Sequence, residues 1–325
     1  MDRETLERAA QRGIISQQQL QQLILFSNTG NVAAEEHTAE EQLRFVRNFG
    51  DIFITLGVLF VTFSVSAMHL SQLEWLVPAA LFLGAAEWLV RIRRLALPGI
   101  AILGSTLYFL GKALGVAEFE TASLQFLTLS AASLLFYLRY RMPFSLLPVA
   151  AGLVAAIISS IGIEVLQHQL LFSALGLLVF LTAMSFDARD RQRQRRASDC
   201  GFWLHLLASP LMVHGMMSAI LLNDSGVLAG GSLREIALLL FFLVFLLTAL
   251  FVDRRAMLVS SLSYAIYAIF QVVSRNLLDS NNLPLLIFIG FGVFIVLFGT
   301  YWYKLRRLIF NPLRDSRIAR LVPAF

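Results

Sequence analysis

Cysteine and charge are both scarce in this chain. A single cysteine, Cys200, among 325 residues excludes a disulfide framework and a cysteine-rich metal site. Asp, Glu, Lys and Arg together make up only 14% of the residues, whereas 58% are hydrophobic. Water-soluble domains average about 25% charged and about 45–50% apolar residues, so this composition predicts a membrane protein.

Lysine is also scarce, and familiar catalytic motifs are missing. Lys112 and Lys304 are the only lysines among 26 basic residues, and the arginines recur in short clusters between apolar runs. Such clusters form no continuous basic face, which argues against nucleic acid as a partner. The chain contains no H-E-x-x-H, G-x-S-x-G or P-loop motif. We therefore expect no enzyme, with no catalytic, cofactor-binding or metal-binding residues.

The N-terminal segment contains no apolar run long enough to cross a bilayer, and it is acidic and rich in glutamine. Gly13 fits a helix C-terminal stop, and Ser16 with Gln19 forms an S-x-x-Q capping box that starts a second helix. The pattern predicts a small cytoplasmic helical hairpin over residues 1–27, which would dock a protein partner. A linker and an amphipathic helix, opened by a second capping box at Thr38, are expected over 28–50.

Apolar runs of 17 to 22 residues follow from residue 52 onward, each about long enough to cross roughly 30 Å of hydrocarbon. They lack the alternating pattern of barrel strands, so helices are expected. The sequence predicts an all-α, polytopic bundle of about ten transmembrane helices, arranged as five hairpins within residues 51–303. The expected spans are 52–68, 73–90, 97–116, 121–138, 143–162, 169–186, 201–222, 233–252, 256–274 and 283–303.

The basic residues fall almost entirely in alternate loops. All of the 26 except Lys112, Arg234 and Arg275 lie on one side of the predicted bundle. Because short cytoplasmic loops retain Lys and Arg during insertion, both termini are expected in the cytoplasm. The basic tail at 304–325 is expected to lie on the anionic inner leaflet. Its alternative is a disordered basic tail.

The basic clusters also recur at a regular interval. Arg93, Arg141 and Arg189 are 48 residues apart, and the helix ends LTAMSFDAR at 181–189 and LTALFVDRR at 247–255 are alike. Internal duplication would explain this, but so would any series of paired spans with short loops and positive-inside selection. Both explanations stay open.

The chain resembles the uncharacterised bacterial polytopic membrane proteins grouped as domain of unknown function 2157. The resemblance rests on LERAAQRGIISQQQLQQL at 6–23, a polar linker, and GDIFITLGVLFVTFSVSA at 50–67, and it covers roughly the first 115 residues. It implies a bacterial inner (cytoplasmic) membrane location. No activity is established for that family, so the resemblance implies no mechanism.

Two histidines share the predicted seventh span. His205 and His214 are nine residues apart, which places them about 180° apart on a helix. They cannot jointly bind one haem or metal ion. Each is expected to be a packed or hydrogen-bonded histidine.

Ionisable residues inside a bilayer are costly and become candidates for function. Lys112 lies near the outer end of the third span, where it would neutralise Glu74 or another outer carboxylate or let its stem reach the interface. Ser105 and Tyr108 extend it into a polar strip, and Gly111 with Gly115 forms a G-x-x-x-G pair that favours close helix packing. Asp51 is expected in the first turn of the first span, and Glu87 is expected to pair with Arg91.

The ninth predicted span carries a polar stripe with helical spacing. One interpretation is that it lines a polar cavity together with Lys112, and the other is that it hydrogen-bonds to neighbouring helices. The stripe consists of Ser260, Tyr264, Tyr267, Gln271 and Ser274.

Two classes of function are compatible with these features. The first is a small-solute carrier, for which ten crossings and the polar strips are the arguments. The alternative is a non-catalytic membrane scaffold that docks a partner through its N-terminal hairpin. The scarcity of intramembrane charge favours the scaffold, and Lys112 with the polar stripe favours transport.

Overall fold

The computed structural model consists of two compact units. It describes residues 10, 12–13, 15–23, 48–115, 122–161, 165–193, 195–221, 232–255, 257–258, 262, 266, 283–313, 316 and 322. The first unit takes in 1–42 with 192–194, and the second takes in 43–191 and 195–325. Every regular element in the described residues is a helix.

The described part of the first unit contains the predicted helix signals. Gly13 adopts a left-handed conformation with φ of 71°, and its N–H donates to the Ala10 carbonyl over 3.0 Å. The next helix, at 17–23, begins with the S-x-x-Q box: Gln19 N–H donates to Ser16 Oγ over 3.2 Å, and Ser16 N–H donates to Gln19 Oε1 over 2.8 Å. Reciprocal capping satisfies two N–H groups that a helix start leaves unpaired. The box at Thr38 lies outside the described residues.

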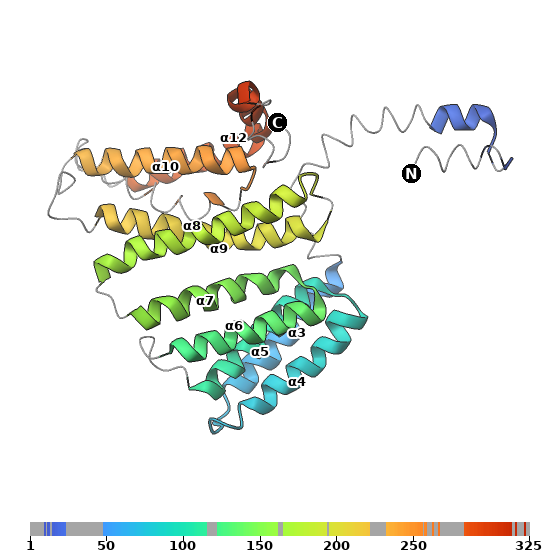
Figure 1. Ribbon diagram of the computed structural model, residues 1–325, viewed down its shortest axis with the longest axis vertical. Helices are drawn as coiled ribbons and strands as arrows, with labels where there is room; N and C mark the ends of the chain where they lie inside the picture. The colour runs from blue at the N-terminus through green and yellow to red at the C-terminus, as the bar shows by residue number, and fades with distance from the viewer. Residues whose placement is uncertain are drawn as a thin grey trace. The chain divides into compact units, whose positions relative to one another are not determined.

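The helices of the second unit overlap every predicted span for which an element is given. Of the span 256–274 the structure describes only 257–258, 262 and 266, which are helical. Figure 1 shows α4 to α10 lying side by side, with neighbours along the chain next to one another. The elements are α3 (Phe49–Ser66), α4 (Leu76–Ala86), the π-helix η1 (Glu87–Ile92), α5 (Ala96–Leu114), α6 (Ser123–Tyr140), the 3-10 helix η3 (Pro143–Ser145), α7 (Leu146–Ile161), α8 (Val165–Arg189), α9 (Arg196–Leu221), α10 (Ser232–Val252), α12 (Leu283–Phe310) and the 3-10 helix η4 (Asn311–Leu313).

Six of the described helical segments are long and apolar enough to cross a membrane. They are Phe49–Ser66, Ala96–Leu114, Pro143–Ile161, Gln169–Arg189, Arg196–Ile220 and Phe288–Phe310. Many of their large apolar side chains are exposed, for example Phe53, which is 61% exposed. Lipid would cover such a surface. These features support a multi-pass membrane protein. The predicted total of ten crossings stays a prediction.

Close packing joins helices that follow one another across arginine-bearing connections: α4 with α5, α6 with α7, and α8 with α9. Glycine allows the last two approaches. A Cβ on Gly152 of α7 would lie 2.8 Å from Ser130 Cβ, and one on Gly176 of α8 would lie 2.7 Å from Met212 N. α3 packs on α5, so the expected first hairpin, 52–68 with 73–90, is not the principal contact of α3. Small residues allow such backbone approach because packing, rather than water exclusion, joins helices in lipid.

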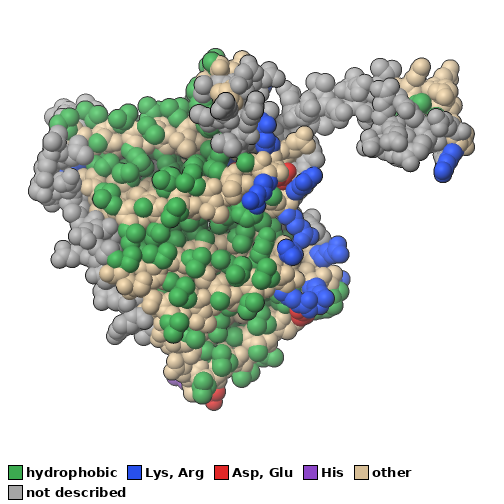
Figure 2. All heavy atoms as spheres, in the orientation of Figure 1, with side chains coloured by type: hydrophobic (Ala, Val, Ile, Leu, Met, Phe, Trp, Pro, Cys, Tyr) green, Lys and Arg blue, Asp and Glu red, His purple; other side chains and the backbone are tan. Residues whose placement is uncertain are grey.

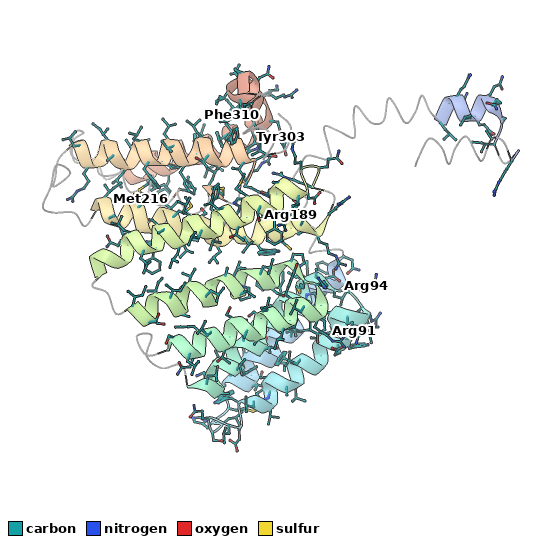
Figure 3. The ribbon with its side chains drawn as sticks, in the orientation of Figure 1. Arg91, Arg94, Arg189, Met216, Tyr303 and Phe310 are labelled. Carbon is teal, nitrogen blue, oxygen red and sulfur yellow. The ribbon has the colours of Figure 1, made fainter. Side chains whose placement is uncertain are left out.

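Basic side chains gather along one edge of the second unit (Figure 2). Contacts connect the helix ends there: Arg139 of α6 binds Glu87, Arg196 of α9 donates to the Arg141 carbonyl over 3.5 Å, and Arg254 binds Asp187. The side chains of Arg91, Arg94 and Arg189 lie at this same edge in Figure 3. Such a one-sided distribution is what the positive-inside prediction requires.

Candidate functional site

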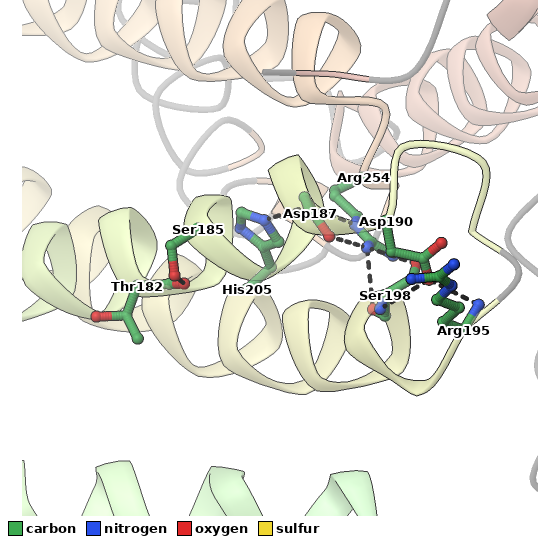
Figure 4. A network of polar contacts seen from close by, with 8 residues as sticks. All are labelled: Thr182, Ser185, Asp187, Asp190, Arg195, Ser198, His205 and Arg254. Atoms are coloured by element: carbon green, nitrogen blue, oxygen red, sulfur yellow. Dashed lines mark hydrogen bonds and ion pairs between the residues drawn. The ribbon is translucent and has the colours of Figure 1, made fainter. Parts of the chain in front are cut away.

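Three ionisable side chains meet inside the bundle where α8, α9 and the segment after α10 come together (Figure 4). His205 Nε2 lies 3.0 Å from Asp187 Oδ2. Arg254 donates from Nε to Asp187 Oδ2 over 3.2 Å and from Nη2 to Asp187 Oδ1. Asp187 is 3% exposed, Arg254 1% and His205 0%. We call these three residues the Asp187 cluster.

Each member of the cluster is held by the end or the face of a helix. Asp187 lies two residues before the end of α8, and His205 lies on the buried face of α9 with its ring against Phe180. Asp253 follows α10 and turns the chain with φ of 61°, and Arg254 comes next. The Arg254 N–H donates to the Ala249 carbonyl over 3.0 Å, which fixes this turn against the helix end.

The start of α9 extends the network. Arg254 Nη2 also donates to the carbonyl and the hydroxyl of Ser198, each over 3.1 Å. Asp190 Oδ2 accepts from Arg195 N–H over 2.7 Å and from Ser198 N–H over 3.4 Å. A carboxylate at these first N–H groups satisfies unpaired donors and faces the positive end of the helix dipole.

A glycine provides the space for the Asp187 carboxylate. Gly201 lies on the first turns of α9, and a Cβ built there would collide with Asp187 Oδ1. Any larger residue would therefore force the carboxylate, or the helix, to move. Gly201 is a steric requirement of the cluster.

The second of the two similar helix ends holds a comparable arrangement. Asp253, which corresponds to Asp187 in the repeated pattern, is 2% exposed, and its Oδ1 accepts from Trp302 Nε1 of α12 over 2.6 Å. Arg255 places its guanidinium 5.5 Å from the ring centre of Trp302 and 5.2 Å from that of Tyr303. Arg306 donates to the carbonyls of Leu250 and Phe251 over 3.2 and 3.3 Å, which satisfies the C-terminal end of α10.

Arg306 therefore differs from the expectation for the basic tail. α12 continues past residue 303 to Phe310, and Arg306 is 2% exposed. Its charge compensates the negative end of α10 instead of facing a lipid surface. Most of the remaining tail lies outside the described residues.

The chemistry of the cluster follows from its charges. Asp187 and Arg254 neutralise each other, and their multiple hydrogen bonds offset part of the cost of removing two charges from water. His205 presents Nε2 to the same carboxylate, and an imidazole can donate a hydrogen bond there either as the neutral ring or as the cation.

The two histidines of α9 have different surroundings. His205 is buried and hydrogen-bonded, whereas His214 is exposed and its ring centre lies 6.4 Å from that of Phe172. The two therefore lie on different faces of α9 and share no ligand. Among the residues that the structure describes, no group of three His, Cys, Asp or Glu side chains could hold a metal ion.

Glu87 pairs with Arg91, as predicted, over 3.1 Å. Two partners were not predicted: Arg139 donates from Nε to Glu87 Oε1 over 2.9 Å and from Nη2 to Oε2 over 3.2 Å, and the Tyr140 hydroxyl donates to Oε1 over 3.0 Å. One carboxylate thus joins the ends of two helices. A bidentate arginine is the strongest form of such a contact.

Asp51 lies in the first turn of α3, where it was predicted, and is 1% exposed. The Asn48 side chain caps the same turn by accepting from the Asp51 N–H over 3.1 Å. The carboxylate is therefore placed beside the positive end of the helix.

Lys112 lies on aromatic rings. Its ammonium is 5.9 Å from the ring centre of Trp75 and 5.8 Å from that of Tyr108, and among the described residues it forms no ion pair with Glu74. Exposed cation–π contacts contribute on the order of 0.5–1 kcal/mol each. The side chains of Lys112 and Tyr108 are exposed, whereas Ser105 is buried and its hydroxyl lies 2.6 Å from that of Thr62 on α3.

The predicted polar strip is therefore divided between an exposed part and a helix contact. Gly115 does not pack a helix either: it ends α5 in a left-handed conformation with φ of 64°. A Cβ built on Gly111 would lie 4.0 Å from Leu129 Cδ1, which is ordinary van der Waals contact, so no close approach depends on this glycine. The polar stripe of Ser260, Tyr264, Tyr267, Gln271 and Ser274 lies outside the described residues, so a cavity shared with Lys112 stays a prediction.

Sequence reasoning did not identify the Asp187 cluster. In the sequence, Asp187 and Arg254 belong to the two similar helix ends, where they indicate only a repeat. The available signal was an aspartate in the last turn of an otherwise apolar helix, which must find a partner if it is buried. Its partners lie 18 and 67 residues away in sequence, and no local pattern connects them.

Similarity to known proteins does not identify the site. A comparison of the chain with protein-family models, with curated proteins and with solved structures finds no match.

Proposed function

We propose that this protein is a small-solute carrier of the bacterial inner membrane, with both termini in the cytoplasm, and that it is not an enzyme. One observation carries the proposal: a buried carboxylate, imidazole and guanidinium meet between α8, α9 and the end of α10. The resemblance to the proteins of domain of unknown function 2157 supports the location only.

Buried ionisable groups are costly in a membrane protein, and their retention favours a role in binding or moving charge. Static packing alone is achieved at lower cost by apolar residues, since replacing a buried ion pair with well-packed apolar groups is often neutral or stabilising. The Asp187 cluster also combines an ion pair with an imidazole, the side chain type that most readily changes its charge. That combination suits a site whose charge changes during a transport cycle.

A scaffold is the second candidate, and one observation favours it. The Asp187 carboxylate is engaged on both oxygens, by Arg254 and His205, which is what a permanent connection between helices requires. In a scaffold these helices would stay together throughout. In a carrier they would separate and admit water.

Water access at Ser209 distinguishes the two candidates. Ser209 is one turn beyond His205, 0% exposed, and its hydroxyl donates to the Met257 carbonyl over 2.7 Å. Ser133 of α6 is equally buried and serves as the matched control. Cys200 is first replaced by Ser, and Ser209→Cys and Ser133→Cys are then made separately in full-length protein in membranes.

A carrier predicts that a small aqueous thiol reagent modifies Ser209→Cys but not Ser133→Cys. It also predicts that Asp187→Asn changes the modification rate at position 209, because the cluster controls opening. Inert cysteines at both positions would contradict the carrier and favour the scaffold. Equal modification at both would indicate general loosening and would also count against the carrier.

A further inference from the structure

An apolar groove opens between α4, α5 and α6, apart from the Asp187 cluster. Its volume is about 460 Å³, and its walls are almost entirely aliphatic and aromatic, including Leu83, Leu107, Leu110 and Phe136. α4 and α6 both pack on α5, and the space between them is bordered by small residues, Ala79, Ala80 and Ala132. Larger side chains at these positions would fill it.

One end of the groove is polar and positively charged. Arg139 and Tyr140 line it, and both bind Glu87. The side chains of Arg91 and Arg139 remain 53% and 48% exposed although both bind the same carboxylate. Two guanidinium groups share one carboxylate, so this end carries a net positive charge.

The arginines also keep donors available. Arg139 uses Nε and Nη2 for Glu87, and among the described residues its Nη1 donates to none. Arg91 uses only Nη1 for Glu87. Guanidinium groups bind phosphate oxygens in the same forked geometry that they use for carboxylates.

We infer that this groove binds one acyl chain of an anionic glycerophospholipid, whose phosphate lies against Arg139 and Arg91. The apolar wall matches hydrocarbon, and the positive end matches an anionic headgroup. Leu83 and Leu135 are 43% and 67% exposed at this surface, as expected for a site open to lipid. A water-soluble anion would gain nothing from such a wall.

The site does not depend on the proposed transport function. It requires only that the helices cross a bilayer and that the basic edge faces an anionic leaflet. Diffuse attraction of all arginines to anionic lipid is the competing explanation. Lipid binding in the groove would depend on which arginine is replaced and on whether the groove is filled. Diffuse attraction would depend on neither.

The test uses full-length protein in detergent that contains equal amounts of phosphatidylglycerol and phosphatidylethanolamine, with bound lipid counted by native mass spectrometry. Ala132→Leu fills the groove, and Ala131→Leu is its control, because Ala131 is exposed and does not line the groove. Arg139→Gln removes the headgroup contact. Arg189→Gln is its control, since Arg189 is an exposed arginine at the end of α8 beside Phe186.

The wild-type protein should retain phosphatidylglycerol preferentially. Arg139→Gln should lower this preference about fivefold, and Ala132→Leu should abolish retention, while both controls stay close to wild type. Ala80→Leu, on the α4 wall, serves as a second filling variant if Ala132→Leu does not yield folded protein. Equal losses in Arg139→Gln and Arg189→Gln, or no difference between Ala132→Leu and Ala131→Leu, would overturn the inference.

Discussion

The α-carbon of Gly201 faces the carboxylate of Asp187 so closely that a Cβ on the glycine would collide with Asp187 Oδ1. α9 therefore needs a glycine at this position for Asp187 to reach His205 and Arg254. Glycine lowers intrinsic helix stability by about 1 kcal/mol relative to alanine. The Asp187–Arg254 ion pair requires glycine here in spite of that cost.

Gly201→Ala should consequently destabilise the protein although alanine is the better helix former. Displacement of a packed group costs typically about 1–3 kcal/mol. Gly84→Ala is the control, because a Cβ there meets nothing within 4 Å and should be neutral or slightly stabilising. The midpoint of thermal unfolding in detergent, followed by size exclusion, measures both. An equal or higher midpoint for Gly201→Ala would show that the contact can relax freely.

Asp187 and Arg254 should be strongly coupled. Asp187→Asn or Arg254→Gln alone leaves a buried charge without its partner, which costs about 3–5 kcal/mol. The double variant removes both charges and should lose clearly less than the sum of the single losses. A double-mutant cycle on the midpoint of thermal unfolding measures the coupling. Additive losses would mean that the two groups do not stabilise each other.

Arg306 should matter more for stability than its exposed neighbour. Arg306→Gln removes a cation from the C-terminal end of α10 and leaves the Leu250 and Phe251 carbonyls without these donors, at a cost on the order of 1–3 kcal/mol. Lys304→Gln changes an exposed cation of the same helix, whose ammonium lies over the Tyr301 ring, and should cost less. Thermal unfolding of both variants tests this, and indistinguishable midpoints would contradict the capping role.

The proposed topology predicts a labelling pattern. In a Cys200→Ser background, single cysteines at 30, 192 and 315 should react with an impermeant thiol reagent only from the cytoplasm. Single cysteines at 119 and 226 should react only from outside. The prediction rests on the distribution of all but three of the 26 basic residues. Mixed labelling within either group would mean that the number of crossings differs from ten.

The polar residues of the third and ninth predicted spans give a separate test of transport. A cavity shared with Lys112 predicts that cysteines at Tyr264, Tyr267 and Gln271 react with small aqueous thiol reagents. Lys112→Ala should then abolish a solute-dependent phenotype without lowering abundance. Because the ammonium lies on the rings of Trp75 and Tyr108, Lys112→Arg should preserve stability and serves as the control. Inert cysteines together with a silent Lys112→Ala would count against a carrier.

The helical class and the positions of the described helices could be predicted from sequence. Long apolar runs determine helices in a membrane, because every backbone polar group must be satisfied within the segment itself. Capping signals such as Ser16 with Gln19, and pairs one turn apart such as Glu87 with Arg91, were also predictable. In both cases the interacting residues are separated by three or four positions, and helix geometry alone brings them together.

Partners that are far apart in sequence were decided only by the tertiary structure. Arg139 and Tyr140 reach Glu87 because α4 and α6 end at the same edge, and Arg254 reaches Asp187 because α10 returns to the end of α8. The same packing placed the Lys112 ammonium on aromatic rings, whereas the sequence predicted contact with a carboxylate or with the membrane interface. Apolar periodicity determines which segments form helices, but lipid surrounds every helix equally and so does not specify neighbours. Glycines such as Gly176 and Gly201, and the buried charges beside them, select which helices meet.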